Sequence, residues 1–205
     1  MIRAMVAALA TLAFAVQPPA ASAAPAAPRP RALTLQIAML DDFFDPEVTE
    51  GVVSIMGVNW SNQGQVFHNV VLVPGPAWYS TNLDEGQSDG TQLEYAGTFD
   101  YVCIYHPAMV GSLRISPLVQ QGSGRVGDTF PIQLSSVDLA TTAYVFDVQR
   151  RRNDGRWGPA RRASDSIYGF TPRRAGAYDL RVRLVEPGAD VVGEWSPRVR
   201  VRVRA

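Results

Sequence analysis

The residues of this chain that are best suited to chemistry are one cysteine, one methionine and two histidines. Cys103, His106 and Met109 form a Cys-x-x-His-x-x-Met pattern directly after an aromatic and β-branched run, and His68 lies further upstream. The sequence has two histidines and one cysteine in all. A single site built from these four residues would therefore use every histidine and every cysteine of the chain.

Thiolate, imidazole and thioether groups in this combination are typical ligands of copper. One cysteine and two histidines in a trigonal plane, with a weak axial methionine, make up the ligand set of blue-copper centres. Soft sulfur favours Cu(I) and imidazole suits both oxidation states, so the set supports one-electron exchange with little rearrangement. We predict one mononuclear copper ion bound by His68, Cys103, His106 and Met109.

Three other uses of these residues are left as alternatives. A zinc site is one, but zinc usually takes further cysteine or histidine ligands, and the chain has none to add. A catalytic Cys–His pair is another, although no third group is evident that would orient the histidine. An unligated thiol is the third, and in an oxidising compartment it would be prone to oxidation.

The N-terminus has the pattern of a secretory signal peptide. A positive residue, Arg3, precedes an apolar run from 5 to 16, and Ala21-Ser22-Ala23 offers a small-residue cleavage site. The apolar run is short for a membrane span, which disfavours the alternative of an uncleaved anchor. We therefore expect a secreted or periplasmic protein with no transmembrane segment after cleavage.

Short segments of β-branched and aromatic residues, separated by turn residues, predict an all-β protein. In the first half we expect strands at 33–40, 52–60, 67–73, 97–103 and 112–115, and a loop over the polar residues 78–89. In the second half we expect strands at 129–134, 143–151, 177–185 and 198–204.

The two halves differ in charge and meet at a Gln-Gln-Gly-Ser-Gly run, which is typical of a flexible linker. Residues 32–118 hold ten acidic residues and one arginine, whereas 119–205 hold nine acidic residues and fifteen arginines. We divide the chain into a signal peptide (1–23), a Pro/Ala-rich leader (24–31), a copper-binding domain (32–118), a linker (119–127) and a second domain (128–205).

The region 33–115 resembles the plastocyanin-like cupredoxins. The segments that carry the resemblance occur in that family's order: Phe44-Asp45-Pro46, Val58-Asn59-Trp60-Ser61-Asn62, Phe67-His68-Asn69-Val70 and the Cys103 loop. The two-residue gap between His106 and Met109 is similar to the short ligand loop of amicyanin. The resemblance implies a Greek-key β-sandwich, the four copper ligands named above, and an Asn69 that steadies the ligand loops by hydrogen bonding.

The same resemblance implies that His106 is an electron portal at the surface, inside an apolar patch where a redox partner docks. Pro107, Ala108 and Val110 would form part of that patch, with Pro74 and Pro76 as further contributors.

The region 128–205 resembles a fibronectin type III or related immunoglobulin-like sandwich. Tyr178 lies where that fold often has a corner tyrosine. The last strand alternates valine and arginine from 199 to 204, which predicts a valine face on the core and an arginine face in solvent. We also expect Arg181 and Arg183 to stack on Trp195 as a cation–π ladder.

These observations predict an exported, monomeric electron carrier that has no enzymatic activity and passes single electrons through Cu(II)/Cu(I). A nucleic-acid partner is not expected, because the basic half has no lysine cluster. One rival is a protein that exchanges copper with partners as a chaperone, store or scavenger. Another is an interaction module in which copper is structural. A third rival, a fragment-like relative of a copper oxidase, has no support, because the three-copper centre of those enzymes needs many more histidines than two.

Overall fold

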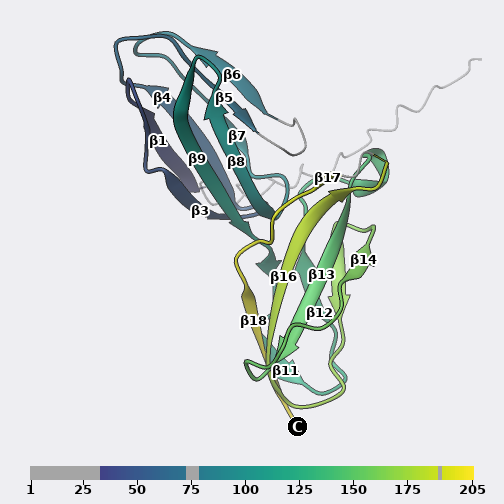
Figure 1. The fold of residues 1–205 in the computed structure, drawn as a ribbon. Coiled ribbons are helices and arrows are strands. Elements are labelled where there is room, and N and C mark those ends of the chain that lie inside the picture. Colours follow the sequence, from purple (N-terminus) through teal and green to yellow (C-terminus); the bar gives the residue numbers. More distant parts are fainter. Residues whose placement is uncertain (1–32, 73–78, 189–190) are drawn as a thin grey trace, which may run out of the picture. The chain divides into compact units, whose positions relative to one another are not determined.

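The computed structural model describes residues 33–72, 79–188 and 191–205, and the regular structure in these ranges is almost entirely β-strand (Figure 1). The expected signal peptide and leader lie outside the described residues. Within them, η1 (Leu139–Thr141) is a short 3-10 helix. No helix in the described ranges has the length and apolar character needed to cross a membrane. The expectation of an all-β protein is confirmed.

Residues 33–116 form two β-sheets. One has the strand order β2-β1-β4-β7 and the other β3-β9-β8-β5-β6. The strands are β1 (Leu33–Met39), β2 (Phe44–Asp45), β3 (Val48–Val52), β4 (Met56–Asn62), β5 (His68–Leu72), β6 (Ser80–Leu83), β7 (Ser88–Gln92), β8 (Gly97–Cys103) and β9 (His106–Ser116). The order brings β8, β9 and β5, which carry the predicted ligands, next to one another in a single sheet.

Aromatic side chains hold the two sheets face to face. Tyr101 of β8 is fully buried and meets Phe44 and Trp60 from the other sheet edge to face, with ring centroids 4.7 and 5.8 Å away. Strand residues alternate between the two faces of a sheet, so Tyr101 and Cys103 point to the same face of β8. The sandwich core therefore fixes the strand that ends at the cysteine.

A glycine makes room for the Tyr101 ring. Gly111 of β9 lies directly opposite Tyr101 across the strand pair, and a Cβ built there would overlap the tyrosine ring. We expect Gly111→Ala to lower the free energy of unfolding by about 3 kcal/mol, the upper end for overpacking a core, because the buried ring has no space to move into. Urea denaturation measures this difference.

The matched control for this substitution is Gly122→Ala, because a Cβ at Gly122 would meet no atom within 4 Å. We expect that variant to stay within about 0.5 kcal/mol of the parent chain. Equal stability of the two variants would contradict the packing argument.

Two strands of this half lie in a segment for which the sequence predicted a loop. The segment 78–89, expected to be a loop, carries β6 and the start of β7. Each of these strands lies at the edge of its sheet, and their residues are mostly exposed and polar. Edge strands of this kind satisfy their backbone from one side only and carry little of the hydrophobic alternation that predicts a strand.

The strand expected at 52–60 was also wrong in its boundaries. A turn at residues 53–55 separates β3 from β4, and Ser54 takes a left-handed backbone conformation with φ of 71°. The turn is hidden in the sequence because Val53 is buried within it, so the apolar pattern continues through the turn.

Residues 118–204 form two further sheets, with the orders β10-β12-β15 and β11-β18-β16-β13-β14, and β17 pairs with β16. The strands are β10 (Leu118–Val119), β11 (Ser123–Arg125), β12 (Phe130–Gln133), β13 (Val145–Arg152), β14 (Arg161–Ala163), β15 (Ile167–Phe170), β16 (Gly176–Glu186), β17 (Val191–Val192) and β18 (Val199–Arg204). The segment 119–127, expected as a linker, thus contains β11 and the end of β10. Both strands pair within these sheets, so much of the segment is ordered by backbone hydrogen bonds.

Tyr178, which the resemblance places at a corner of this half, makes a hydrogen bond to the backbone upstream of it. The Tyr178 hydroxyl donates to the backbone oxygen of Arg174 at 2.8 Å, and its ring meets Phe170 of the other sheet at 5.1 Å. Val201 and Val203 of β18 are buried while Arg202 and Arg204 are exposed, as the alternation predicts. The resemblance of this half to a fibronectin type III sandwich remains a prediction.

The expected cation–π ladder is present and is longer than expected. Arg181 and Arg183 lie over the Trp195 ring, 4.7 and 4.6 Å from its centroid. Arg181 also lies 4.3 Å from the centroid of Trp157, over which Arg151 packs from 4.8 Å. The outer face of the β13-β16 pair is therefore a continuous stack of guanidinium and indole groups.

Candidate metal centre

The strand order places three of the four predicted ligands at one end of a sheet. Cys103 ends β8 and His106 begins β9, and only the turn residues Ile104 and Tyr105 separate them. The ladder is irregular between Val102 and Cys103, where a register shift re-aims the chain. His68 begins β5, which pairs with β8.

The ligand atoms of these three residues converge. The Nδ1 atoms of His68 and His106 are 3.1 Å apart, and the Cys103 Sγ lies 3.8 Å from the first and 3.4 Å from the second. A point equidistant from the three atoms lies about 2.0 Å from each, close to the ~2.0–2.3 Å of metal–nitrogen and metal–sulfur bonds in zinc sites. The geometry therefore fits a metal ion of the first transition row, and the three residues form a group that can hold one.

Burial differs among the three residues. His68 and Cys103 are fully buried, whereas His106 is only partly buried. The pKa of His68 is lowered below its ordinary value, mainly by burial and to a smaller extent by the nearby His106. The carboxylates of Asp41 and Asp42 have the opposite, weaker effect. The His68 imidazole is therefore neutral at neutral pH, the form that a metal ligand requires.

The second nitrogen of the His68 ring, Nε2, has an unusual environment. It is buried and has no hydrogen-bond partner among the described residues. Gly64 lies beside it, and a Cβ at that position would be 3.2 Å from Nε2 and would overlap the Asp41 carboxylate. A metal ion bound at Nδ1 would leave the ring proton on Nε2, on the side of the ring that faces Gly64.

Met109 is the fourth predicted ligand. It lies on β9, three residues beyond His106, and its side chain is fully buried. Residues 103 and 109 both point to the core side of the β8-β9 pair, as their burial shows. The axial role of its thioether remains a prediction.

Asn69 links the two ligand loops as the sequence resemblance implied. Its side-chain oxygen accepts a hydrogen bond from the Ile104 N–H at 2.9 Å, and its own backbone N–H donates to the Cys103 Sγ at 3.4 Å. Hydrogen bonds to a thiolate stabilise its charge, and a pinned Ile104 fixes the turn between Cys103 and His106.

Removing the Asn69 side chain tests this link. We expect Asn69→Ala to weaken copper binding by ~10–100-fold, as outer-sphere substitutions generally do, because the turn at Ile104 loses its anchor. Competition titration with a chelator of known affinity measures the change. Asn82→Ala is the matched control, since Asn82 lies opposite Asn69 on β6 with an exposed side chain. Equal affinities of the two variants would contradict the role of Asn69.

Apolar side chains surround His106 at the surface. Pro107, Ala108 and Val110 are exposed as predicted, whereas Pro74 and Pro76 lie outside the described residues. The sequence reasoning missed the aromatic part of this patch: the exposed rings of Phe67 and Tyr105 meet edge to face at 5.0 Å. Both residues directly adjoin predicted ligands, and this adjacency was the available signal.

Several solved structures are similar to this chain, and they are cupredoxins, the family that the sequence resembles. A purple cupredoxin from Nitrosopumilus maritimus is 24% identical with a TM-score of 0.38, and the match covers 40% of this chain and 99% of that one. A reduced proline-to-phenylalanine mutant of amicyanin is 23% identical with a TM-score of 0.37, over 40% of this chain and 81% of that one. A methionine-to-alanine mutant of amicyanin in its Cu(I) form is also 23% identical, with a TM-score of 0.36 and the same coverage. No protein-family model and no curated protein matches the chain.

Proposed function

We propose that this protein is an exported electron carrier that binds one copper ion through His68, Cys103, His106 and Met109. The observation that carries the proposal is the convergence of one thiol sulfur and two imidazole nitrogens within 3.1–3.8 Å of one another. One thiolate with two imidazoles is a set that holds both copper oxidation states, and the bound ion would supply a one-electron Cu(II)/Cu(I) couple.

Each residue of the chain has a distinct part in this proposal. Cys103 supplies the thiolate from inside the sandwich, where burial keeps water away from the sulfur. His68 is held in the core, and His106 is the ligand that reaches the surface. The exposed apolar side chains around His106 offer a contact surface for a redox partner, since patches of this kind mark interaction sites.

The test is a visible absorption spectrum of the chain without residues 1–23, loaded with one equivalent of Cu(II) and then cycled with reductant and oxidant. We expect an intense thiolate-to-copper band that bleaches on reduction and returns in full on oxidation. Copper retained through repeated cycles identifies a carrier. Copper lost on reduction would contradict the carrier function and indicate a protein that exchanges copper with partners.

Export is part of the same proposal and rests on the signal-like pattern of residues 1–23. Mass spectrometry of the chain recovered from its expressing cells tests it. We expect a mature N-terminus near residue 24 in the extracytoplasmic fraction. A chain found intact in the cytoplasm would overturn it.

A further inference from the structure

Arginines of the C-terminal half divide into two groups that differ in their partners. Five arginines on the outer face of the β18-β16-β13-β14 sheet or at its edge each form an ion pair with Asp147, Asp154 or Asp179; they are Arg151, Arg162, Arg183, Arg198 and Arg200. The other ten arginines of residues 119–205 form no ion pair with a carboxylate within the described part of the chain: Arg125, Arg150, Arg152, Arg156, Arg161, Arg173, Arg174, Arg181, Arg202 and Arg204. Four of these ten, Arg150, Arg161, Arg173 and Arg174, lie together in the fold.

These four arginines line one cavity of about 410 Å³. Arg150 comes from β13, Arg161 from β14, and Arg173 and Arg174 from the segment between β15 and β16. No acidic residue lines the cavity, and its remaining wall is formed by Phe170, Thr171, Pro172 and Tyr178. The cavity thus combines four guanidinium groups with a largely apolar floor.

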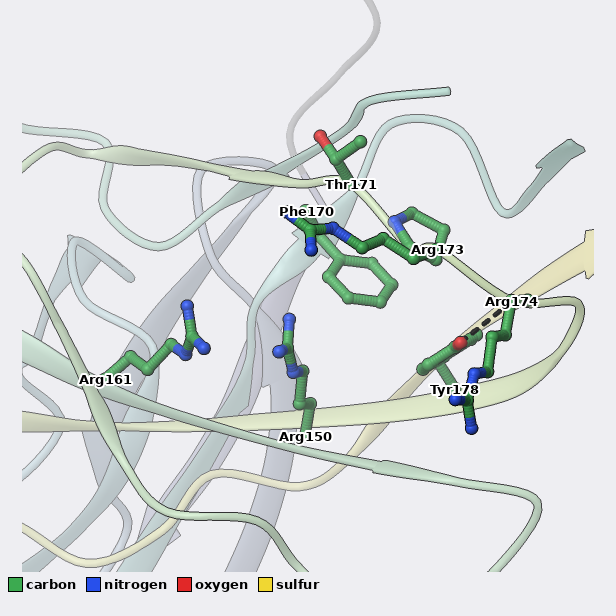
Figure 2. A pocket seen from close by; sticks show the side chains of 8 residues that line it. Arg150, Arg161, Phe170, Thr171, Arg173, Arg174 and Tyr178 are labelled. Carbon is green, nitrogen blue, oxygen red and sulfur yellow. Dashed lines mark hydrogen bonds between the residues drawn. The ribbon is translucent and has the colours of Figure 1, made fainter. Parts of the chain in front are cut away.

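The wall that carries Arg173 and Arg174 is fixed to the sheet. The Tyr178 hydroxyl holds the Arg174 backbone at 2.8 Å, and the guanidinium of Arg150 lies 5.8 Å from the centroid of the Phe170 ring. Figure 2 shows Arg173 reaching across Phe170 toward Arg150, with Arg161 on the same side, whereas Arg174 runs alongside Tyr178. Arg150 and Arg173 therefore lie close to Phe170, and Arg161 lines the same cavity to one side of them.

A second cavity of about 300 Å³ adjoins the first. The two share Arg150, Arg161 and Tyr178, and no acidic residue lines the second. The second cavity adds the ion-paired Arg151 and two arginines without an ion pair, Arg152 and Arg156. The arginine-lined surface therefore extends from the first cavity into the second, and it is larger than a site for a single anion.

The chemistry of the guanidinium group selects the ligand. It offers five N–H donors and no acceptor, in a planar fork that matches the oxygens of carboxylate and phosphate. A carboxylate carries one charge and two oxygens, whereas a phosphate group carries ~1.5–2 charges and three strong acceptor oxygens at pH 7. Three guanidinium groups without a carboxylate partner, all lining one cavity, match the phosphate group better.

We propose that the two adjoining cavities bind a ligand with two or more linked phosphate groups. The first phosphate lies among Arg150, Arg161 and Arg173 in front of Phe170, and the next is reached past Arg150 by Arg152 and Arg156. The shared chemistry is a phosphoanhydride chain, either inorganic polyphosphate or the diphosphate of an organic ester.

The experiment is isothermal titration calorimetry with pyrophosphate at a fixed ionic strength of ~0.15 M. It uses the purified chain without metal, so that chelation of copper cannot contribute heat. We expect pyrophosphate to bind, and to bind at least tenfold more tightly than inorganic phosphate. Arg161→Gln and Arg173→Gln should each weaken pyrophosphate binding by about tenfold or more, because each removes charged hydrogen bonds to the ligand. Both side chains are exposed, so neither substitution disturbs the core.

Arg202→Gln is the matched control. It removes the same charge from an exposed position on β18 that lines neither cavity, and we expect affinity within about twofold of the parent chain. An equal loss in this variant, or no heat with millimolar pyrophosphate, would overturn the proposal. Tighter binding of tripolyphosphate than of ADP indicates an inorganic chain, and the reverse order indicates a diphosphate ester.

Discussion

Cys103→Ala is expected to abolish the visible copper band and to weaken Cu(II) binding by more than the ~10–100-fold that outer-sphere substitutions cost. The sulfur of Cys103 lies within 3.8 Å of both imidazole Nδ1 atoms, and the sequence holds no second cysteine that could replace it. Without a thiolate no sulfur-to-metal absorption can arise. Absorption spectroscopy and a chelator competition measure the two effects on the same samples.

The variant Met109→Leu distinguishes the contribution of the axial thioether from that of the Cys103 thiolate. Leucine fills a similar volume, so the fully buried position 109 keeps its packing. We expect the band to persist, because Cys103, His68 and His106 remain, and the reduction potential to change, because the axial ligand tunes it. A band that survives Cys103→Ala would contradict the site, whereas an unchanged potential in Met109→Leu would remove Met109 from it.

The cluster of His68, Cys103 and His106 could be predicted from the sequence because histidine and cysteine are so scarce in it. With two histidines and one cysteine, few combinations exist, and their spacing after an aromatic strand favoured one of them. The convergence of Nδ1 atoms within 3.1 Å follows from the pairing of β5 with β8 and of β8 with β9. Only a pattern of long-range strand pairs brings His68 to the loop, and the sequence alone does not display it.

The features that were not predicted involve residues whose type does not indicate whether they are buried or exposed. In β6 and β7 most side chains face solvent, so the strands exist through backbone pairing and leave no hydrophobic period. The aromatic patch at Phe67 and Tyr105 was missed for a related reason: exposed aromatic residues look the same in sequence as core residues until burial is known.

For the arginine face of residues 119–205, the sequence predicted the orientation of β18 but not the ion pairs. Alternation in residues 199–204 predicted which side of β18 faces the core, because period two is a local property. It could not show that Asp179 of β16 lies opposite both Arg151 and Arg200, since that depends on the register of three strands. The same register leaves Arg150 and Arg161 without a carboxylate.

Asp179→Asn is expected to lower the free energy of unfolding at pH 7 by about 2–3 kcal/mol, because a buried partner of several charges is removed. Its carboxylate is 1% exposed and accepts hydrogen bonds from Arg200 at 2.6 Å, Arg198 at 2.8 Å and Arg151 at 2.9 Å. The amide keeps the shape of the side chain but leaves three guanidinium groups around a neutral centre. Urea unfolding followed by tryptophan fluorescence measures the loss.

The pH dependence of the unfolding free energy offers a second test of the role of Asp179. The hydrogen bond from Arg200 above all, together with those from Arg151 and Arg198, lowers the pKa of Asp179 far below its ordinary value of 3.8. The folded carboxylate therefore binds fewer protons than the unfolded one, and its contribution to stability is complete above the unfolded pKa. It is lost as the pH falls from about 4 toward the lower folded pKa.

The parent chain should therefore lose stability more steeply below pH 4 than Asp179→Asn, and the difference between the two should shrink as the pH falls. Asp154→Asn is the matched control, because Asp154 contacts the same three arginines from a side chain that is 64% exposed. An exposed carboxylate of this kind contributes about 0–1 kcal/mol. If the unfolding free energies of Asp179→Asn and the parent chain changed in parallel from pH 7 to pH 3, ionisation of Asp179 would not be what stabilises the fold over this pH range.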